Sequence, residues 1–122
     1  MTLRFLSSTN HGIVDYLAAA DLIIAPFILN LGDSNPMALW LSVISGFLVI
    51  IVSLATKYQY GAIKLIPFGG HLTLDLLVAT FFMFVPLLFK LDGLDEAYYY
   101  INAAVVYLVV AVTESESAAI TI

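Results

Sequence analysis

The chain has no cysteine and few charged residues. Charged residues make up 11% of its 122 residues, with nine aspartates and glutamates against four lysines and arginines, so the formal net charge is −5. The lack of cysteine excludes disulfides, thiolate metal sites and cysteine nucleophiles. The lack of a basic patch argues against nucleic acid as a partner.

Apolar residues are in excess, at 62% of the sequence, and the mean hydropathy is +1.04. Ordinary soluble domains are about half apolar and about a quarter charged. A surface of this composition belongs in lipid, where every backbone polar group must be hydrogen-bonded internally and helices are favoured. We predict a single transmembrane domain over residues 1–122, in the cell membrane or an inner membrane, with the lipid bilayer as its surroundings.

Four apolar segments follow one another, separated by short turn signals. A hydrocarbon core of ~30 Å requires about 20 apolar residues for one helical crossing. We expect helices at about 12–31, 37–56, 71–89 and 97–113. Because connections this short join antiparallel neighbours, the sequence predicts an all-α fold, a four-helix transmembrane bundle.

The sequence contains a two-fold internal repeat. A His-x-x-x-Asp motif that begins at His11 occurs again at His71, an offset of sixty residues. Self-similarity at a long period indicates a supersecondary unit that buries its apolar face against its own copy. We place repeat 1 at about 11–56 and repeat 2 at about 71–113, as tandem parallel two-helix repeats related by an axis along the membrane normal. The same offset pairs Pro26 with Pro86, Leu31 with Leu91, Ser42 with Asn102, and Leu48 with Leu108.

The basic residues predict how the bundle is oriented. Arg4, Lys57 and Lys64 lie on one side of the expected membrane, and Lys90 alone lies on the other. Cytoplasmic loops carry the excess of lysine and arginine in membrane proteins. Both termini are therefore predicted to be cytoplasmic.

Each repeat carries an acidic residue in its first helix and a proline near the end of that helix. Repeat 1 has Asp15 and the run Ala25-Pro26-Phe27, and repeat 2 has Asp75 and the run Val85-Pro86-Leu87. In these features the chain resembles the small membrane proteins built from SPW repeats, two-helix units with an acidic residue in the first helix and a small-Pro-aromatic motif near its end. The resemblance covers both halves and implies the tandem two-helix architecture, but it implies no particular biochemical activity.

The two His-x-x-x-Asp motifs predict a metal site. Residues four apart share one helix face and lie about one turn, ~5–6 Å, apart, so a histidine and an aspartate at this spacing can reach the same ion. Two such helices facing each other at equal depth supply two imidazoles and two carboxylates, which suits tetrahedral zinc. The spacing is similar to that of the paired metal-binding helices of cation diffusion facilitator transporters. The candidate metal ligands are His11, Asp15, His71 and Asp75.

Two other interpretations of the motifs remain open. The four side chains can be structural, capping their own helices or pairing across the repeats, because unpaired polar groups are costly in lipid. Alternatively, His11 and His71 can be the axial ligands of a haem held between the first and third helices. The candidate cofactors are thus a divalent metal such as zinc, or a haem.

Asp21 lies outside the repeat pattern, since the offset of sixty places Phe81 at the corresponding position. At 100° per residue it lies about 240° around the helix from Asp15, on a different face. We expect Asp21 to contact a partner protein, to line a water-filled pocket, or to hydrogen-bond a serine or tyrosine of a neighbouring helix.

The sequence has no Gly-rich phosphate loop, no nucleophile elbow and no further paired carboxylates, so we expect no enzyme activity. The leading interpretation is a non-catalytic four-helix integral membrane protein that acts as an accessory or scaffold subunit, or as a self-assembling module, with a membrane protein or a second copy as partner. The alternative is a membrane protein that binds a divalent metal or a haem through the two motifs and takes part in ion passage.

Overall fold

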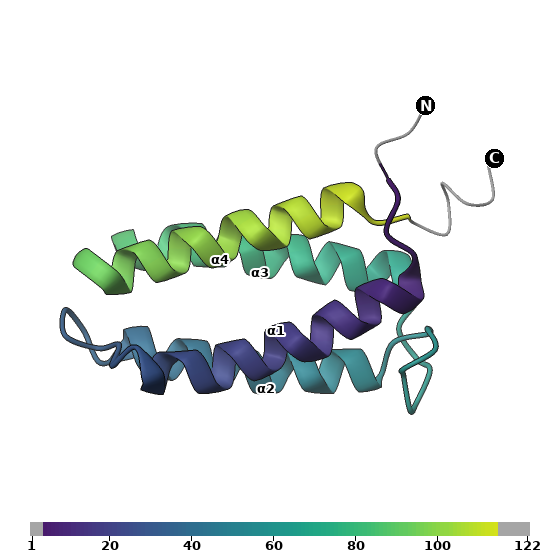
Figure 1. Cartoon of the computed structure of the whole chain (residues 1–122), viewed down its shortest axis with the longest axis horizontal. Helices are drawn as coiled ribbons and strands as arrows, with labels where there is room; N and C mark the ends of the chain where they lie inside the picture. The colour runs from purple at the N-terminus through teal and green to yellow at the C-terminus, as the bar shows by residue number, and fades with distance from the viewer. Residues whose placement is uncertain (1–3, 115–122) are drawn as a thin grey trace.

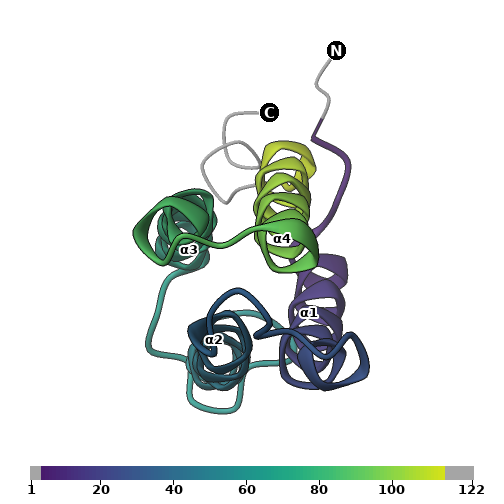
Figure 2. The ribbon, with the colours of Figure 1, turned by 90° about the vertical axis from the view of Figure 1, so that its left-hand side faces the viewer.

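The computed structural model describes residues 4–114, which form four α-helices. They are α1 (Ser8–Ile28), α2 (Met37–Leu54), α3 (Phe68–Leu88) and α4 (Gly93–Val112). The helices run up and down along the long axis of the molecule (Figure 1), and they pack most closely within each repeat, α1 on α2 and α3 on α4. Viewed from one end, α1 and α3 lie on one diagonal of the bundle, and α2 and α4 on the other (Figure 2). The predicted all-α four-helix bundle is confirmed.

The two helices that carry the histidines begin earlier than the sequence predicted. α1 starts at Ser8 instead of about residue 12, and α3 starts at Phe68 instead of residue 71. The Ser7 hydroxyl accepts a hydrogen bond from the Asn10 N–H at 3.2 Å, which satisfies one of the free donors at the start of α1. Each histidine therefore lies inside the first turn of a helix, where its side-chain direction is fixed by regular backbone.

The same two helices end in the same way. Asn30 and Lys90, sixty residues apart, have left-handed backbones with φ of 52° and 53°. After Asn30, the N–H of Leu31 donates to the carbonyl of Pro26 at 2.9 Å, and the corresponding bond at the end of α3 has the same length. This is the Schellman ending, whose buried leucine packs back on the helix. The repeat pattern thus fixes both the start and the end of α1 and α3.

The second helices follow a different offset. Equivalent buried residues of α1 and α3 are sixty residues apart in the sequence. Equivalent buried residues of α2 and α4 are 57 residues apart, as Thr56 and Thr113 are. The connection at residues 29–36 is longer than the one at residues 89–92 and absorbs the difference. The predicted pairings of Ser42 with Asn102 and of Leu48 with Leu108 were therefore wrong, since Ser42 corresponds to Tyr99 and Leu48 to Val105. The buried pairs are Ala38 and Asp95, Ser42 and Tyr99, Gly46 and Ala103, Ser53 and Val110, and Thr56 and Thr113.

Three helices, α1, α2 and α3, are long and apolar enough to cross a membrane. α4 has a similar length, 20 residues, but carries Asp95 and Glu96 in its first turn. Large apolar side chains point outward, among them Leu17, Ile51 and Leu108, which are 61–66% exposed. Such a surface suits lipid and supports an integral membrane bundle. The crossing of α4 and the cytoplasmic position of the termini stay predictions.

Backbone pairing joins the two repeats at one end of the bundle. Leu6 forms a parallel bridge with Thr113, and Ile66 forms the equivalent bridge with Thr56. The segment before each first helix therefore pairs with the segment after the second helix of the other repeat. We call this the cluster end, because both His-x-x-x-Asp motifs lie there.

Candidate metal centre

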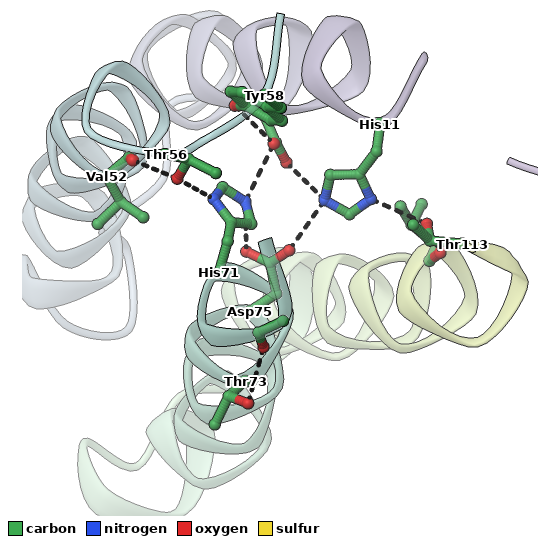
Figure 3. Close-up of polar contacts among 11 residues, drawn as sticks. His11, Val52, Thr56, Tyr58, His71, Thr73, Asp75 and Thr113 are labelled. Atoms are coloured by element: carbon green, nitrogen blue, oxygen red, sulfur yellow. Dashed lines mark hydrogen bonds and ion pairs between the residues drawn. The ribbon is translucent and has the colours of Figure 1, made fainter. Parts of the chain in front are cut away.

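The four predicted ligands meet at the cluster end, between the diagonal helices α1 and α3 (Figure 3). One nitrogen or oxygen from each of His11, Asp15, His71 and Asp75 lies within 4.8 Å of the others, and these residues form the His/Asp cluster. The two histidines and Asp15 are buried, and Asp75 is partly exposed. The structure brings together all four residues that the repeat pattern selected, while their role as metal ligands stays a prediction.

The four groups alternate in a closed ring. His11 Nε2 lies 3.1 Å from Asp15 Oδ1 and 3.0 Å from Asp75 Oδ2. His71 Nε2 lies 3.0 Å from Asp15 Oδ2 and 3.4 Å from Asp75 Oδ1. Each carboxylate thus bridges both imidazoles with its two oxygens, once along its own helix and once across the repeats.

Each imidazole is oriented by a threonine of the other repeat. This threonine lies just after the second helix of that repeat. His11 Nδ1 lies 2.8 Å from Thr113 Oγ1, and His71 Nδ1 lies 2.7 Å from Thr56 Oγ1. Both threonine hydroxyls donate their single proton to the backbone carbonyl four residues earlier. They can therefore only accept from the imidazoles, so Nδ1 carries a proton and Nε2 faces the carboxylates.

With both imidazoles neutral, this arrangement is electrostatically repulsive, and only added protons or a bound cation can remove the repulsion. A neutral imidazole with its proton on Nδ1 points the Nε2 lone pair at the lone pairs of two carboxylates. The repulsion is removed by a proton on each Nε2, or by one divalent cation held between the four groups. In both cases the cluster is neutral, because two positive charges balance two carboxylates, and neutrality is what burial requires.

The two histidines differ in their contacts with the carboxylates. The His71 Nε2 is fully buried and makes no hydrogen bond of acceptable geometry in the described part of the chain, even though carboxylate oxygens lie 3.0 and 3.4 Å away. An N–H needs an acceptor on its axis. The His11 Nε2 has such an acceptor in Asp75 Oδ2 at 3.0 Å, whereas the His71 Nε2 has none among the described residues.

The spacing of the ring is close to that of a small tetrahedral ion site. Metal–ligand bonds of about 2.0–2.1 Å place neighbouring ligand atoms about 3.3–3.4 Å apart, because a tetrahedron's edge is about 1.6 times its centre-to-corner distance. The four His–Asp separations, 3.0 to 3.4 Å, lie at or slightly below this value but use both oxygens of each carboxylate. With one ligand atom from each residue, all four atoms lie within 4.8 Å of one another, so a bound ion would draw them closer together. A haem does not fit between His11 and His71, because the carboxylates occupy the space around both Nε2 atoms that the macrocycle would need.

Aromatic side chains close the cluster toward the end of the bundle. The Tyr58 hydroxyl donates to Asp15 Oδ2 at 3.0 Å. Burial raises the pKa of Tyr58, so this hydroxyl keeps its proton and remains a donor. Phe68 meets the ring of His11 edge-on at 5.4 Å and stacks on His71 at 6.1 Å. These rings exclude water from the side of the cluster that faces the loops.

A family model of the SPW repeat domain matches residues 9–116. The matched range contains both His-x-x-x-Asp motifs and both helix pairs. The chain belongs to the SPW-repeat family. This confirms the resemblance, although the runs Ala25-Pro26-Phe27 and Val85-Pro86-Leu87 stand where the family motif reads Ser-Pro-Trp. No curated protein and no solved structure matched this SPW-repeat protein.

Three residues that hydrogen-bond to the His/Asp cluster of this SPW-repeat protein were not singled out from the sequence. They are Thr56, Thr113 and Tyr58. The threonines could have been found as the last members of the 57-residue offset, each closing one repeat. Tyr58 lies in the connection between the repeats and has no counterpart among the described residues, so no repeat signal identifies it.

Proposed function

We propose that this SPW-repeat protein is a non-catalytic membrane protein that binds one divalent cation, of which zinc is the best example, at the His/Asp cluster. The bound ion ties the two repeats together. The observation that carries the proposal is the closed ring of two imidazoles and two carboxylates, in which both Nε2 atoms face negative groups and His71 Nε2 has no hydrogen bond among the described residues.

Charge balance supports a divalent ion over other cations. Two carboxylates and two neutral imidazoles carry a charge of −2, which one divalent cation cancels. Imidazole and carboxylate are both ligands that zinc accepts in four-coordinate sites. The threonine hydroxyls that accept from both Nδ1 atoms are the outer partners expected for metal-bound histidines.

The packing supports a role in holding the repeats together. The helices pack closely within each repeat and only sparsely between repeats. Of the four His–Asp contacts in the ring, two cross from one repeat to the other, His11 to Asp75 and His71 to Asp15. An ion shared by four side chains would replace these weak cross-contacts by bonds to one centre.

The test is zinc binding by the purified chain in detergent. Elemental analysis after dialysis against zinc should give one ion per chain, and competition with a chelating dye gives the dissociation constant. His71→Ala should abolish binding, while Asp33→Asn, an exposed acid at the opposite end of the bundle, should leave it unchanged. Wild-type protein that holds no zinc, and whose melting temperature zinc does not raise, would show that the ring is a protonated structural pair and would refute the proposal.

A further inference from the structure

A crevice with mostly apolar walls leads from the His/Asp cluster into the middle of the bundle. It has a volume of about 310 Å³ and runs between α1 and α4, which lie side by side in Figure 2. His11, Asp15 and Asp75 form one end of this large crevice, and Asp21 and Asn102 lie farther along it. Its other walls are mostly valine and leucine. The volume is sufficient for several water molecules, and three carboxylates and an amide provide the polar partners that water needs.

The pseudo-two-fold symmetry supplies an internal comparison. A small crevice of about 60 Å³ lies between α2 and α3. Each of the eight residues that line it has a counterpart in the wall of the large crevice, at an offset of sixty or 57. The large crevice has Ala18 where the small one has Val78, and Val105 where it has Leu48. Only the α1–α4 side is widened, and only that side contains a carboxylate outside the cluster.

That carboxylate is Asp21, which the sequence analysis left with three possible roles. It makes no hydrogen bond or ion pair with any residue between 4 and 114, and it lines the large crevice. Six residues at 1.5 Å each place it about 9 Å deeper along α1 than Asp15. An ionisable side chain inside a membrane-crossing helix is costly and marks the pathway of an ion or polar ligand.

Away from the two crevices, other side chains within residues 4–114 cover the cluster. Its histidines are 0% and 1% exposed, and Tyr58 and Phe68 cover the side toward the loops. The most exposed member is Asp75, whose side chain is 20% exposed and lines both crevices. A cation that reaches the cluster without unfolding the loops must therefore pass Asp75 from a crevice.

We propose that the large crevice is the loading route for the divalent cation, and that Asp21 attracts and holds the cation transiently before it reaches the His/Asp cluster. This inference rests on the proposed function. Because Asp21 is not a ligand of the final site, it acts on the rates of binding and release and leaves the equilibrium affinity unchanged. A carboxylate in a cleft with apolar walls raises the local cation concentration and the association rate.

The first experiment is stopped-flow zinc loading of the full-length protein in lipid nanodiscs, with a chelating dye as reporter. In Asp21→Asn, the association and dissociation rates should both fall about tenfold, at the lower end of the range for electrostatic attraction in clefts, and the dissociation constant should stay within twofold. An equilibrium affinity equal to that of the wild type also shows that the variant is folded. Unchanged rates, or a dissociation rate that rises, would overturn the route.

The second experiment uses the symmetry as its control. Val105→Phe fills the large crevice and Leu48→Phe fills the small one, at equivalent positions that are 52% and 54% exposed. Val105→Phe should slow zinc loading, and Leu48→Phe should not; equal effects would refute the assignment of the route to the large crevice. If the wild-type protein binds no zinc at equilibrium, the proposed function itself is wrong. If zinc affinity is intact but the variants leave the loading rates unchanged, only the loading route is wrong.

Discussion

The two ends of the bundle hold the repeats together by different means. At the cluster end, the diagonal helices α1 and α3 meet through a buried ring of charged side chains. At the opposite end the contact is apolar. Leu22, Leu31 and Ala38 of repeat 1 share one core with Phe82 and Tyr99 of repeat 2, whose rings pack edge-on at 4.9 Å. Hydroxyls add to it, since Tyr99 donates to the carbonyl of Ala38 at 2.6 Å and the Tyr98 and Ser42 hydroxyls lie 2.5 Å apart. One end depends on a charge balance that an ion can change, and the other depends on shape.

Symmetry is kept at the first end and relaxed at the second. The ring uses the same residue types from both repeats, as do the threonines behind it. At the opposite end, the equivalent positions Ser42 and Tyr99 differ in size and chemistry. A ring of four ligands needs two equal halves, whereas a packed core needs only to be filled. The comparison supports the proposal that the metal site lies at the cluster end.

The largest effect is expected from removing one charge of the ring. Asp15→Asn and Asp75→Asn each leave a divalent cation with a net charge of +1 in a buried site, so each should weaken zinc binding more than about 100-fold. Competition with a chelating dye measures this. The apolar end should keep the helices assembled, which circular dichroism checks. Tight zinc binding by either variant would show that the ring is not the ligand set.

The next largest effect is expected from the apolar end. Phe82 is 1% exposed, and Phe82→Ala removes its packing against Tyr99. Because in lipid the loss is mainly of packing contacts, we expect the low end of the range for large-to-small core changes, about 3 kcal/mol of unfolding free energy. Unfolding in mixed detergent micelles measures this. Zinc affinity should not change.

The control for this variant is the neighbouring residue. Phe81 is 42% exposed, toward the surroundings of the bundle, and Phe81→Ala should cost less than about 0.5 kcal/mol. Equal destabilisation by the two variants would contradict the division into a packed end and a charged end.

The sequence predicted the cluster end better than any other part. His11 and Asp15 share a helix face, the offset of sixty repeats them at His71 and Asp75, and parallel repeats put both pairs at one depth. None of these steps depends on loops. Because α1 and α3 also end in equivalent Schellman turns, the offset holds along the whole of both helices.

The sequence-based prediction was wrong where the two repeats differ in the length of the connection between their helices. The longer loop at residues 29–36 shifts the offset of the second helices from sixty to 57, which hid the equivalence of Thr56 and Thr113. Asp95 shows how this loop is held, since its carboxylate accepts from the N–H groups of Gly32 and Ser34, each at 2.9 Å. Loop conformation of this kind leaves no periodic signal. Tyr58, which also comes from a connection, was missed for the same reason.

A smaller effect on the cluster end is expected from the threonines. Thr56→Val and Thr113→Val keep the side-chain shape but remove the acceptor for Nδ1–H, so each should weaken zinc binding about 10- to 100-fold, as loss of an outer partner of a metal ligand does. Thr73→Val is the control. Thr73 makes the same bond to the carbonyl four residues earlier (3.0 Å) and lies on α3 near the cluster, but its hydroxyl makes no hydrogen bond to a histidine within residues 4–114. A similar loss in the control would show that helix stability, not imidazole orientation, is being measured.

The smallest effect is expected from one hydroxyl at the apolar end. Tyr99→Phe keeps the buried ring and removes only its hydrogen bond to the Ala38 carbonyl. That carbonyl retains its bond within α2, so no acceptor is left unpaired, and interhelical hydrogen bonds in membrane proteins contribute on average about 0.6 kcal/mol. We expect a loss of about 0.5–1 kcal/mol in unfolding free energy, with zinc affinity unchanged. Tyr100→Phe is the control, because the Tyr100 hydroxyl makes no hydrogen bond to another residue within 4–114, and it should have no measurable effect. A loss above about 2 kcal/mol in Tyr99→Phe would mean that this end is held by polar bonds as much as the cluster end is, and the contrast between the two ends would disappear.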